Sequence, residues 1–395
     1  MKELVVIGAG FAGQGVVNQL RKNKNFHITI IDKNNFISYK PLFPDVAAGR
    51  LAPEIIEYPL GQYAKSKKID FISGRVSSIN TNSCEIHINN SKIAYDYLVI
   101  ATGVETAFHG FDHFRKYAYT IDSLEECKRL QHDLQIKLYS DTESIKVSII
   151  GGGYTGIETA THIRQTIVRH KKKHNITVIE AQDRILKGMP EWIQNKAVKH
   201  LQRSNIEVLT NAGVTDITGT AVHLGKQVIP ADIIIWSAGM QGTDVASFFS
   251  SLTRHKRIDV DNYLRPDGLE NVFIAGDASS LYRMSVPIAK QYAEYAASSI
   301  VLLEKQAVPP PFKAKDYGYI IALADHRGIG KLGILPVDGL FGYLFHYFMC
   351  GLSLLGWKNK WRLLTSILSN MIYGKESAAP IRTAEKKTLE GVNNE

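Results

Sequence analysis

Two glycine-rich segments, each with an acid downstream, are the residues in this sequence best placed to do chemistry. Residues 8–13 read GAGFAG and are followed by Asp32, while residues 151–156 read GGGYTG and are followed by Glu180. In this G-x-G-x-x-G pattern the first glycine permits a tight turn, the second lets the backbone approach a pyrophosphate, and the third lets helix and strand pack closely. An acid at the end of the next strand accepts hydrogen bonds from ribose hydroxyls and repels a 2′-phosphate, so Glu180 favours NADH over NADPH.

The sequence around each glycine segment predicts the strand, helix and strand that such a site needs. Apolar runs at Leu4–Ile7 and Lys146–Ile150 come first, and helices are expected to end near Lys22 and Arg169. The second strands are expected at Ile28–Ile31 and Thr177–Ile179. The positive N-terminus of each helix would then face a pyrophosphate. We therefore predict an α/β fold with two Rossmann-like dinucleotide-binding domains, which suggests electron transfer between one permanently held and one exchanged cofactor.

Composition excludes several other classes of protein. The 395 residues are 45% hydrophobic and carry a net charge of +9, which fits a globular chain, and no motif beyond that charge points to nucleic acid. Three cysteines, far apart in sequence, give no CxxC or CxxxxC pair and no zinc-ligand spacing, so we expect no metal and a reducing compartment. The first apolar run leads straight into a glycine motif and reads as a buried strand, so we expect no secretion.

Five motifs stand in the order found in two-dinucleotide-binding-domain flavoproteins, which the chain resembles over roughly residues 1–375. They are Gly8–Gly13 with Asp32, Tyr97–Gly103 (YLVIATG), Gly151–Glu158 (GGGYTGIE), Trp236–Gly239 (WSAG) and Val272–Asp277 (VFIAGD). The resemblance implies FAD on the first glycine segment, NADH on the second, and Asp277 on the ribityl chain of FAD. The physical argument agrees, because a helix expected over residues 287–304 would point its N-terminus at the flavin edge that gains negative charge on reduction.

Four shorter segments resemble type II NADH dehydrogenases, the single-chain NADH:quinone oxidoreductases. They are Tyr39–Gly49, Pro59-Leu60, Thr155–Glu158 and Pro311–Gly318. The resemblance implies that hydride passes from NADH to FAD and that electrons then reach a membrane quinone without proton pumping. In that family the glutamate matching Glu158 lies near the nicotinamide and quinone sites and helps to couple them.

The family's AQxAxQ motif on the quinone-side helix is only partly matched, by Lys290–Tyr295 (KQYAEY). Gln291 and Ala293 fit, whereas a lysine replaces the first alanine and a tyrosine the last glutamine. A lysine there would stabilise anionic reduced flavin, and a tyrosine would stack on a quinone or hydrogen-bond to it. We expect Glu158, Lys290 and Gln291 to be catalytic, and the departure leaves the identity of the acceptor open.

The same resemblance implies a set of cofactor contacts and a division into domains. The cofactor-binding residues expected are Gly8, Gly10, Phe11, Ala12, Gly13, Asp32, Lys33, Lys40, Pro41, Val76, Ala101, Thr102, Gly103, Gly151, Gly153, Tyr154, Thr155, Gly156, Glu180, Ala238, Gly239, Gly276, Asp277 and Ala289. The expected domains are an FAD domain of residues 1–108 and 245–310, an NADH domain of residues 109–244, and a C-terminal membrane-associating region of residues 311–395.

Two other functions remain open at this point. Sulfide:quinone oxidoreductases are related, but they oxidise sulfide on paired cysteines, and none of Cys84, Cys127 and Cys350 follows the second glycine motif where that family places one. The other alternative is a flavoprotein in which NADH binding regulates association and turnover is incidental. Slow flavin reoxidation by every quinone would favour that sensor.

The C-terminal region is expected to attach to a membrane. Residues 340–357 are mostly apolar and reach the lower length limit of a spanning helix, but several glycines and polar residues weaken a span. Trp357 and Trp361 bracket two lysines, a pattern suited to the depth of lipid headgroups. We expect a peripheral protein on the cytoplasmic side of the cell inner membrane that binds an anionic surface and a membrane quinone and forms a homodimer. A single span and a soluble core or dimer interface are the alternatives.

Overall fold

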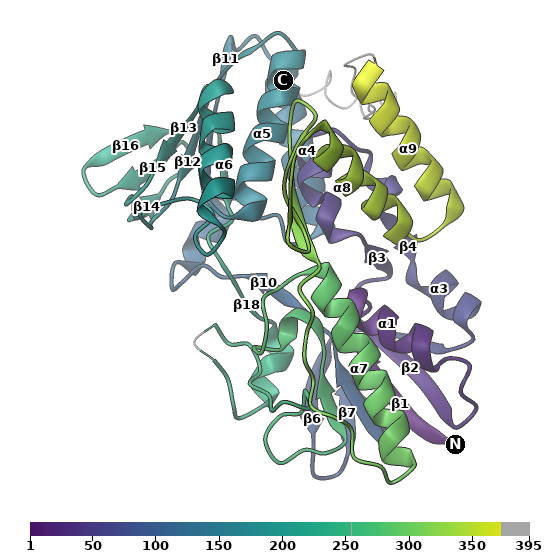
Figure 1. Cartoon of the computed structure of the whole chain (residues 1–395). Coiled ribbons are helices and arrows are strands. Elements are labelled where there is room, and N and C mark those ends of the chain that lie inside the picture. The colour runs from purple at the N-terminus through teal and green to yellow at the C-terminus, as the bar shows by residue number, and fades with distance from the viewer. Residues whose placement is uncertain (254, 373–395) are drawn as a thin grey trace, which may run out of the picture. The chain divides into compact units, whose positions relative to one another are not determined.

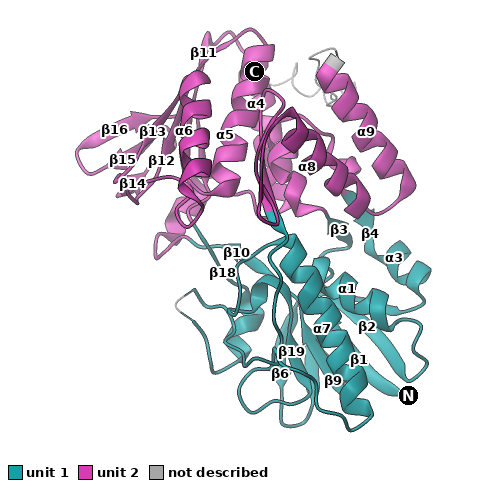
Figure 2. Ribbon diagram, in the orientation of Figure 1, with its two compact units in different colours: residues 1–38, 57–107, 239–318 teal, residues 39–56, 108–238, 319–395 magenta. Residues whose placement is uncertain are grey.

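The chain forms two compact units in a computed structural model, which describes residues 1–253 and 255–372 (Figures 1 and 2). Unit 1 contains residues 1–38, 57–107 and 239–318, and unit 2 contains residues 39–56, 108–238 and 319–395. The polar segment from residue 376, expected to lack fixed structure, lies outside the described residues. The α/β fold class is confirmed, since each unit is built on a parallel sheet.

Unit 1 is built on a five-stranded parallel sheet in the order β19-β9-β1-β2-β5. Its strands are β1 (Lys2–Ile7), β2 (Phe26–Asp32), β5 (Asp70–Ser73), β9 (Tyr97–Ile100) and β19 (Val272–Ile274). Strands β9 and β19 are continuous apolar runs because both faces of the sheet are covered there, whereas the edge strand β5 is only partly buried. Strand β1 lies between β2 and the later strand β9, so the strand order reverses beside it, where ligands of such sheets bind.

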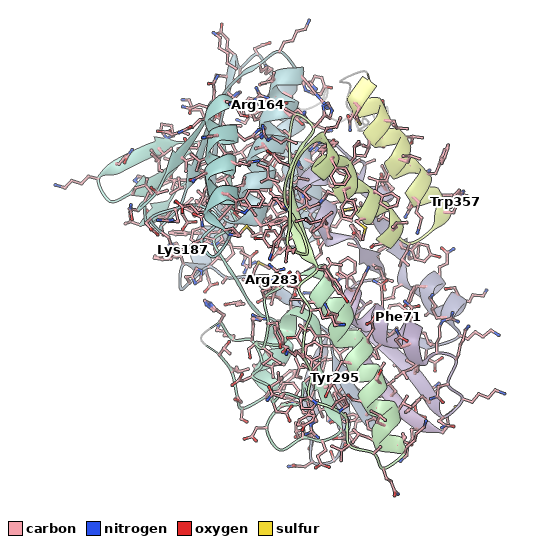
Figure 3. All side chains as sticks on the ribbon, viewed as in Figure 1. Phe71, Arg164, Lys187, Arg283, Tyr295 and Trp357 are labelled. Carbon is pink, nitrogen blue, oxygen red and sulfur yellow. The ribbon has the colours of Figure 1, made fainter. Side chains whose placement is uncertain are left out.

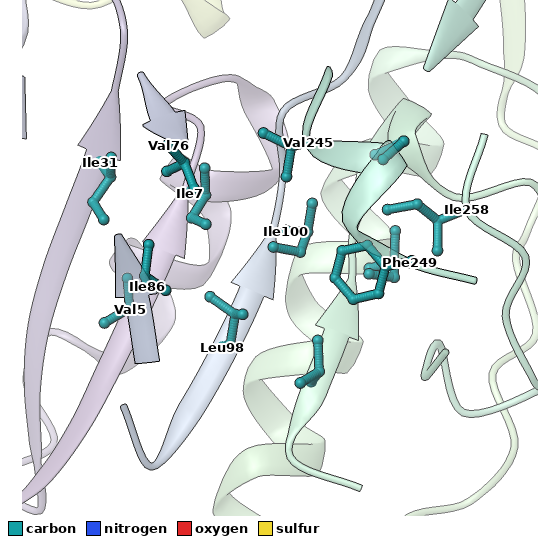
Figure 4. Close-up of a cluster of buried hydrophobic side chains, with 14 of the residues drawn as sticks. Val5, Ile7, Ile31, Val76, Ile86, Leu98, Ile100, Val245, Phe249 and Ile258 are labelled. Atoms are coloured by element: carbon teal, nitrogen blue, oxygen red, sulfur yellow. The ribbon is translucent and has the colours of Figure 1, made fainter. Parts of the chain in front are cut away.

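Helices cover one face of this sheet and an antiparallel sheet covers the other. Helix α1 (Phe11–Leu20) packs against α7 (Val286–Glu304), and the second sheet contains β6 (Val76–Asn80), β7 (Glu85–Ile88) and β8 (Ser91–Ala94). Alternate residues of the parallel strands meet β6 and β7 in one apolar core, to which Val5, Ile7, Ile31, Val76, Ile86, Leu98 and Ile100 contribute (Figure 4). This alternation is the period of two that a strand imposes.

Helix α7 begins where the sequence predicts it. The Ser285 side chain accepts a hydrogen bond from the N–H of Ile288, and Pro287 occupies the first turn. Both features stabilise a helix start. The remaining elements of unit 1 are β3 (Phe36–Ser38), β4 (Glu57–Pro59), α3 (Leu60–Lys67), β10 (Val104–Thr106), β18 (Met240–Gly242), η4 (Asp244–Phe248) and η5 (Gly276–Ala278).

Unit 2 repeats the architecture on a four-stranded parallel sheet in the order β13-β12-β11-β17. Its strands are β11 (Ser144–Ile150), β12 (Lys173–Ile179), β13 (Ile206–Leu209) and β17 (Ile233–Trp236). The helices and short elements around it are η1 (Lys40–Leu42), α2 (Phe43–Ala47), η2 (Pro53–Ile55), η3 (Asp112–Lys116), α4 (Leu124–Tyr139), α5 (Tyr154–Arg169), α6 (Glu191–Arg203), β14 (Asp216–Ile217), β15 (Ala221–Leu224) and β16 (Gln227–Pro230).

The C-terminal part of unit 2 is a three-stranded sheet followed by two helices. The elements are β20 (Gly318–Leu323), β21 (Arg327–Leu332), β22 (Leu335–Gly339), α8 (Leu340–Ser353) and α9 (Trp357–Ile372). Asp325 and His326, between β20 and β21, both have left-handed backbone angles, with φ of 58° and 57°. This is the geometry of a tight two-residue hairpin turn. Arg164 of α5 donates to the Asp325 carboxylate at 3.0 Å and ties the turn to the helix.

The polar side chains of α5 cover the free edge of β20. Tyr154 donates to the carbonyl of Ile320, Glu158 accepts the N–H of Ala322 at 2.7 Å, and Thr161 accepts the N–H of Ala324 at 3.2 Å. The helix presents a side chain every three to four residues, and the strand presents a free backbone group every second residue. The helix therefore satisfies an edge that would otherwise be open to pairing.

The compact units differ from the expected domains at several places. Residues 239–244, expected with the NADH domain, belong to unit 1, and the expected separate C-terminal region belongs to unit 2 from residue 319. Residues 39–56, expected with the FAD domain, belong to unit 2, where α2 packs against α4 and α5. Residues 311–318, expected in the C-terminal region, belong to unit 1. The apolar stretch from residue 340 is interrupted by residues 354–356, so it forms two helices instead of one. Among the described residues, no helix is both long and apolar enough to span a bilayer.

One face of α8 and α9 is apolar and exposed to solvent. We call it the C-terminal apolar surface, and its members are Leu340, Phe341, Leu344, Phe348, Met349, Leu352, Trp357, Trp361, Leu364 and Leu368. Exposed Lys358 and Arg362 flank it. Trp357 is 77% exposed and points away from its unit at the start of α9 (Figure 3). Contiguous exposed apolar side chains of this kind mark a contact surface.

Candidate functional site

The two glycine segments have the same backbone geometry. Gly8 and Gly151 follow β1 and β11 with φ of +105° and +107°. A Cβ on Gly8 would lie 2.3 Å from the carbonyl oxygen of Ala101, and one on Gly151 would lie 2.6 Å from that of Ser237. Only glycine fits a turn with this φ against a neighbouring strand end. The tight turn predicted at both positions is present.

Of the two other glycines in each copy of the pattern, one has no room for a side chain and one faces open space. A Cβ on Gly13 would lie 1.9 Å from the carbonyl oxygen of Gly8, and one on Gly156 would lie 2.1 Å from that of Gly151. At Gly10 and Gly153, the N-caps of α1 and α5, a Cβ would meet no atom within 4 Å. Open backbone at a helix N-terminus fits a pyrophosphate, because the helix dipole and free N–H groups attract the anion.

The acid of each copy is held in the same way. One oxygen of Asp32 accepts the N–H of Ala9 at 2.8 Å, and one oxygen of Glu180 accepts the N–H of Gly152 at 2.8 Å. The second oxygen of Asp32 accepts the N–H of Asn34 at 2.8 Å, and that of Glu180 accepts the N–H of Gln182 at 2.9 Å. These contacts fix each carboxylate beside its glycine turn, where ribose hydroxyls of a bound nucleotide would lie.

The later motifs of unit 1 converge on the same strand ends. Ala101 follows β9 and meets Gly8, and the Thr102 hydroxyl lies 3.0 Å from that of Thr243. A Cβ on Gly276 would lie 3.0 Å from the Cβ of Ala12 and 3.7 Å from that of Ala289. The half-buried Asp277 is therefore placed beside the starts of α1 and α7. This arrangement fits a carboxylate that receives the ribityl hydroxyls of FAD.

The remaining expected cofactor residues lie at varied positions. Lys33 is exposed at the end of β2, Val76 is buried at the start of β6, and Gly103 has a φ of +67°. Gly239 belongs to unit 1, whereas Lys40, Pro41 and Ala238 belong to unit 2. Phe11 begins α1, and Tyr154 and Thr155 begin α5.

The two expected catalytic residues of α7 have different surroundings. The ammonium group of Lys290 lies 6.0 Å from the centre of the Phe11 ring, at the start of α1. The Gln291 amide accepts the backbone N–H of Lys315 at 2.7 Å and donates to its carbonyl at 2.9 Å. The Gln291 side chain therefore holds the segment that follows Pro311 against α7. Sequence reasoning missed this contact, since its partner is a backbone group.

Glu158, the third expected catalytic residue, is 4% exposed on the first turns of α5. Burial raises the pKa of its carboxyl well above the ordinary value, and the charge of Asp45 raises it further. The N–H of Ala322 and the guanidinium of Arg50 act in the opposite direction. A carboxyl of this kind is typical of groups that hold a proton at neutral pH.

A buried charged cluster beside Glu158 escaped the sequence analysis. Asp45 and Arg50 are 2% and 1% exposed and form an ion pair with 3.1 Å between Nη1 and Oδ1. Tyr347 donates to the Asp45 carboxylate at 2.7 Å, and Arg50 donates to the hydroxyl of Tyr343 at 3.2 Å. His162, one turn beyond Glu158 on α5, lies 3.8 Å from Asp45. The one sequence signal for this cluster was the four-residue spacing of Glu158 and His162, which places both side chains on the same face of a helix.

Comparisons with known proteins show what the chain as a whole resembles. The family described as pyridine nucleotide-disulphide oxidoreductase matches residues 2–293. The type II NADH:quinone oxidoreductase of Staphylococcus haemolyticus is 26% identical over 358 residues, which cover 83% of this chain and 89% of that protein. The protein of the same name from Staphylococcus aureus is 24% identical over 367 residues, covering 86% of this chain and 91% of that one.

Two solved structures share the fold over nearly the whole chain. The structure of NDH2 from Plasmodium falciparum in complex with NADH has a TM-score of 0.84 at 17% identity, and it covers 96% of this chain and 100% of that one. The sulfide:quinone oxidoreductase of Aquifex aeolicus has a TM-score of 0.79 at 19% identity, and it covers 96% of both chains. At these identities the likeness concerns the fold.

Proposed function

The chain belongs to the pyridine nucleotide-disulphide oxidoreductase family, and from this premise we propose that it is an FAD-dependent NADH:quinone oxidoreductase of the type II kind. The observation that carries the proposal is the pair of matching glycine turns, one in each unit, each with its carboxylate fixed beside an open helix N-terminus. The curated relatives named type II NADH:quinone oxidoreductases support the choice of donor and acceptor.

The chain's own residues bind and orient the two nucleotides. Asp32 and Asp277 of unit 1 would hold FAD, with its pyrophosphate at the N-terminus of α1. Glu180 of unit 2 would hold NADH, with its pyrophosphate at the N-terminus of α5. FAD, when bound, takes two electrons from NADH and passes them to the quinone. Lys290 and the N-terminus of α7 add positive potential in unit 1, and burial raises the pKa of the Glu158 carboxyl in unit 2.

Anaerobic mixing with NADH and then with a quinone tests this function. We expect NADH to bleach the flavin absorbance of the purified protein and menaquinone or ubiquinone analogues to restore it, because the two nucleotide sites serve consecutive half-reactions. Rapid bleaching without restoration by any quinone would contradict the proposal and favour the NADH sensor.

Replacement of all three cysteines separates the proposal from sulfide oxidation. All three cysteines are free thiols: Cys84 lies in the turn before β7, Cys127 on α4 and Cys350 on α8. Burial raises the pKa of Cys127 and that of Cys350, so neither is a ready nucleophile. The triple alanine variant should keep its quinone reductase activity with NADH. If turnover disappeared while FAD stayed bound, thiol chemistry would have to be reconsidered.

Nucleotide preference is a further prediction, and it tests Glu180. NADPH should be a weaker donor than NADH by at least tenfold in kcat/KM, about 1.4 kcal/mol, because the fixed carboxylate repels a 2′-phosphate. Glu180→Ala should reduce this preference, and Asp183→Ala, which removes an exposed acid three residues away, is the matched control. Equal efficiency of the wild type with both donors would show that Glu180 does not face the ribose.

Membrane attachment through the C-terminal apolar surface is the part of the proposal that concerns location. Its aromatic and aliphatic side chains with flanking Lys358 and Arg362 suit the boundary between lipid tails and anionic headgroups. From the family resemblance we further propose a homodimer that lies on the cytoplasmic side of the inner membrane and draws its quinone from the bilayer.

A further inference from the structure

Five ionisable side chains of unit 2 lie close together, four of them buried and one, His346, half-buried. Asp45 and Arg50 come from α2 and the chain after it, Glu158 and His162 from α5, and His346 from α8. The connecting contacts are short: 3.1 Å between Arg50 and Asp45, and 3.8 Å between Asp45 and His162. Glu158 accepts the N–H of Ala322 at 2.7 Å and lies one turn before His162 on α5.

Only one of the two carboxyls in this cluster has a charged partner within ion-pair distance. Asp45 faces the guanidinium of Arg50 and also accepts the Tyr347 hydroxyl proton at 2.7 Å. The hydrogen-bond donor to the Glu158 carboxyl is a neutral backbone group, the N–H of Ala322. Burying a second, unpaired negative charge costs much more than burying a neutral acid. Burial raises the pKa of both carboxyls, but the guanidinium of Arg50 and the hydroxyl of Tyr347 act against this at Asp45. The geometry therefore leaves Asp45 as the carboxylate and Glu158 as the acid.

The other titratable groups that face the cluster are neutral at pH 7. Burial lowers the pKa of His162 well below its ordinary value and that of His346 to about 4. The remaining groups are acids that are neutral when protonated, and burial raises the pKa of each one. They are Tyr39, Tyr154, Tyr343, Tyr347 and Cys350. The single positive charge of Arg50 is therefore balanced by one negative charge.

We propose that the buried Asp45–Arg50 pair sets the charge of Glu158. With the pair intact, Glu158 is a neutral acid that stores a proton. Without Asp45, Glu158 loses this proton and becomes the counter-ion of Arg50. Asp45 and Arg50 act through Glu158 and are positioning residues.

The inference deepens the proposed function and rests on it for its use. Reduction of a quinone by NADH consumes one proton beyond the hydride: NADH, the quinone and H⁺ give NAD⁺ and the quinol. A neutral Glu158 supplies a proton inside unit 2 and takes one back from water after each turnover. A Glu158 carboxylate would have none to give.

Infrared spectra of the resting holoenzyme test the charge without any turnover. The carbonyl band of a buried carboxylic acid should be present in the wild type at pH 7 and absent in Glu158→Gln, which assigns it. Asp45→Asn should lose this band. The double variant Asp45→Asn/Arg50→Gln removes both charges and should regain it, because no cation then remains to stabilise the carboxylate.

Two further variants serve as controls. In Arg50→Gln the unpaired Asp45 should take up a proton, so a second acid band appears beside that of Glu158. Asp338→Asn breaks the half-buried ion pair with Arg327, with contacts of 2.9 and 3.0 Å, elsewhere in unit 2 and should leave the Glu158 band unchanged. A band that persists in Asp45→Asn overturns the proposal. So does a band that stays absent in the double variant, since its loss would then reflect altered packing.

A pH profile adds the functional arm. In Asp45→Asn, flavin reoxidation by a quinone should decline at a pH at least about one unit lower than in the wild type, because Glu158 ionises earlier. The double variant should restore the profile. If the infrared pattern holds but the protein reduces no quinone, the charge assignment stands and the proposed function fails. An unshifted profile together with an unchanged band would overturn the inference.

Discussion

Replacement of Gly10 by alanine is expected to give a folded protein that retains little FAD. The added Cβ would meet no protein atom within 4 Å, so unit 1 should keep its stability. The same Cβ would project from the helix N-terminus, where the backbone must approach the pyrophosphate. We expect FAD affinity to fall at least tenfold, about 1.4 kcal/mol. The ratio of flavin to protein absorbance after gel filtration, together with the circular dichroism spectrum, measures both effects.

Two other glycines supply the comparison that this experiment needs. Gly61→Ala, on the exposed start of α3, also adds a Cβ with no neighbour within 4 Å and should leave FAD bound. Gly13→Ala places its Cβ 1.9 Å from the Gly8 carbonyl oxygen and should destabilise unit 1 itself. A Gly10→Ala protein with full flavin content would show that the pyrophosphate does not lie against this turn.

Loss of membrane binding is expected when the C-terminal apolar surface is made polar. Leu344, Phe348, Trp357 and Trp361 are between 42% and 77% exposed. Full burial of one such side chain in an apolar phase contributes about 1.5–3 kcal/mol, and each of the four is already partly covered, so each contributes less than this. After replacement of all four by serine, we expect binding to liposomes to weaken by roughly a hundredfold or more. FAD should stay bound, and long-chain quinones should lose more activity than short soluble ones.

Flotation with liposomes that contain anionic lipid provides the measurement. High salt should weaken wild-type attachment only in part, because it screens Lys358 and Arg362 but leaves the apolar contact intact. Tyr139→Ser/Val228→Ser replaces two apolar residues of unit 2 outside this surface, which are 76% and 51% exposed, and should float like the wild type. A quadruple variant that still floats would place the attachment elsewhere. Deletion of the two helices is a poorer test, because α8 also supplies Tyr343 and Tyr347 to the buried Arg50 and Asp45.

The local signals in the sequence predicted the glycine turns and much of the fold. Helix α5 ends at the expected residue, Arg169, and α7 begins one residue before its expected start. Helix α1 ends at Leu20, two residues before its expected end. These elements depend on near neighbours in sequence, namely apolar runs, a glycine turn and a capping serine, so their patterns suffice.

Contacts between distant residues could not be predicted in this way. Asp45 stands in a segment that resembles a family loop, and Arg50 directly follows it. Nothing in this part of the sequence shows that two tyrosines near the C-terminus cover the pair. The amide of Gln291 contacts a backbone group, which leaves no trace in residue type. Residues 39–56 likewise belong to unit 2 because of their contacts with residues much later in the chain.

The distance along the chain between Arg50 and Tyr343 has a consequence for synthesis in the cell. The two residues are 293 positions apart, so at roughly 5–20 residues per second a ribosome takes about 15–60 s to produce the second after the first. During this interval the charges of Asp45 and Arg50 lack the hydroxyls that cover them. Unit 2 can therefore close only when the chain is nearly complete, and a prematurely terminated chain exposes this pair to the proteases that remove faulty products.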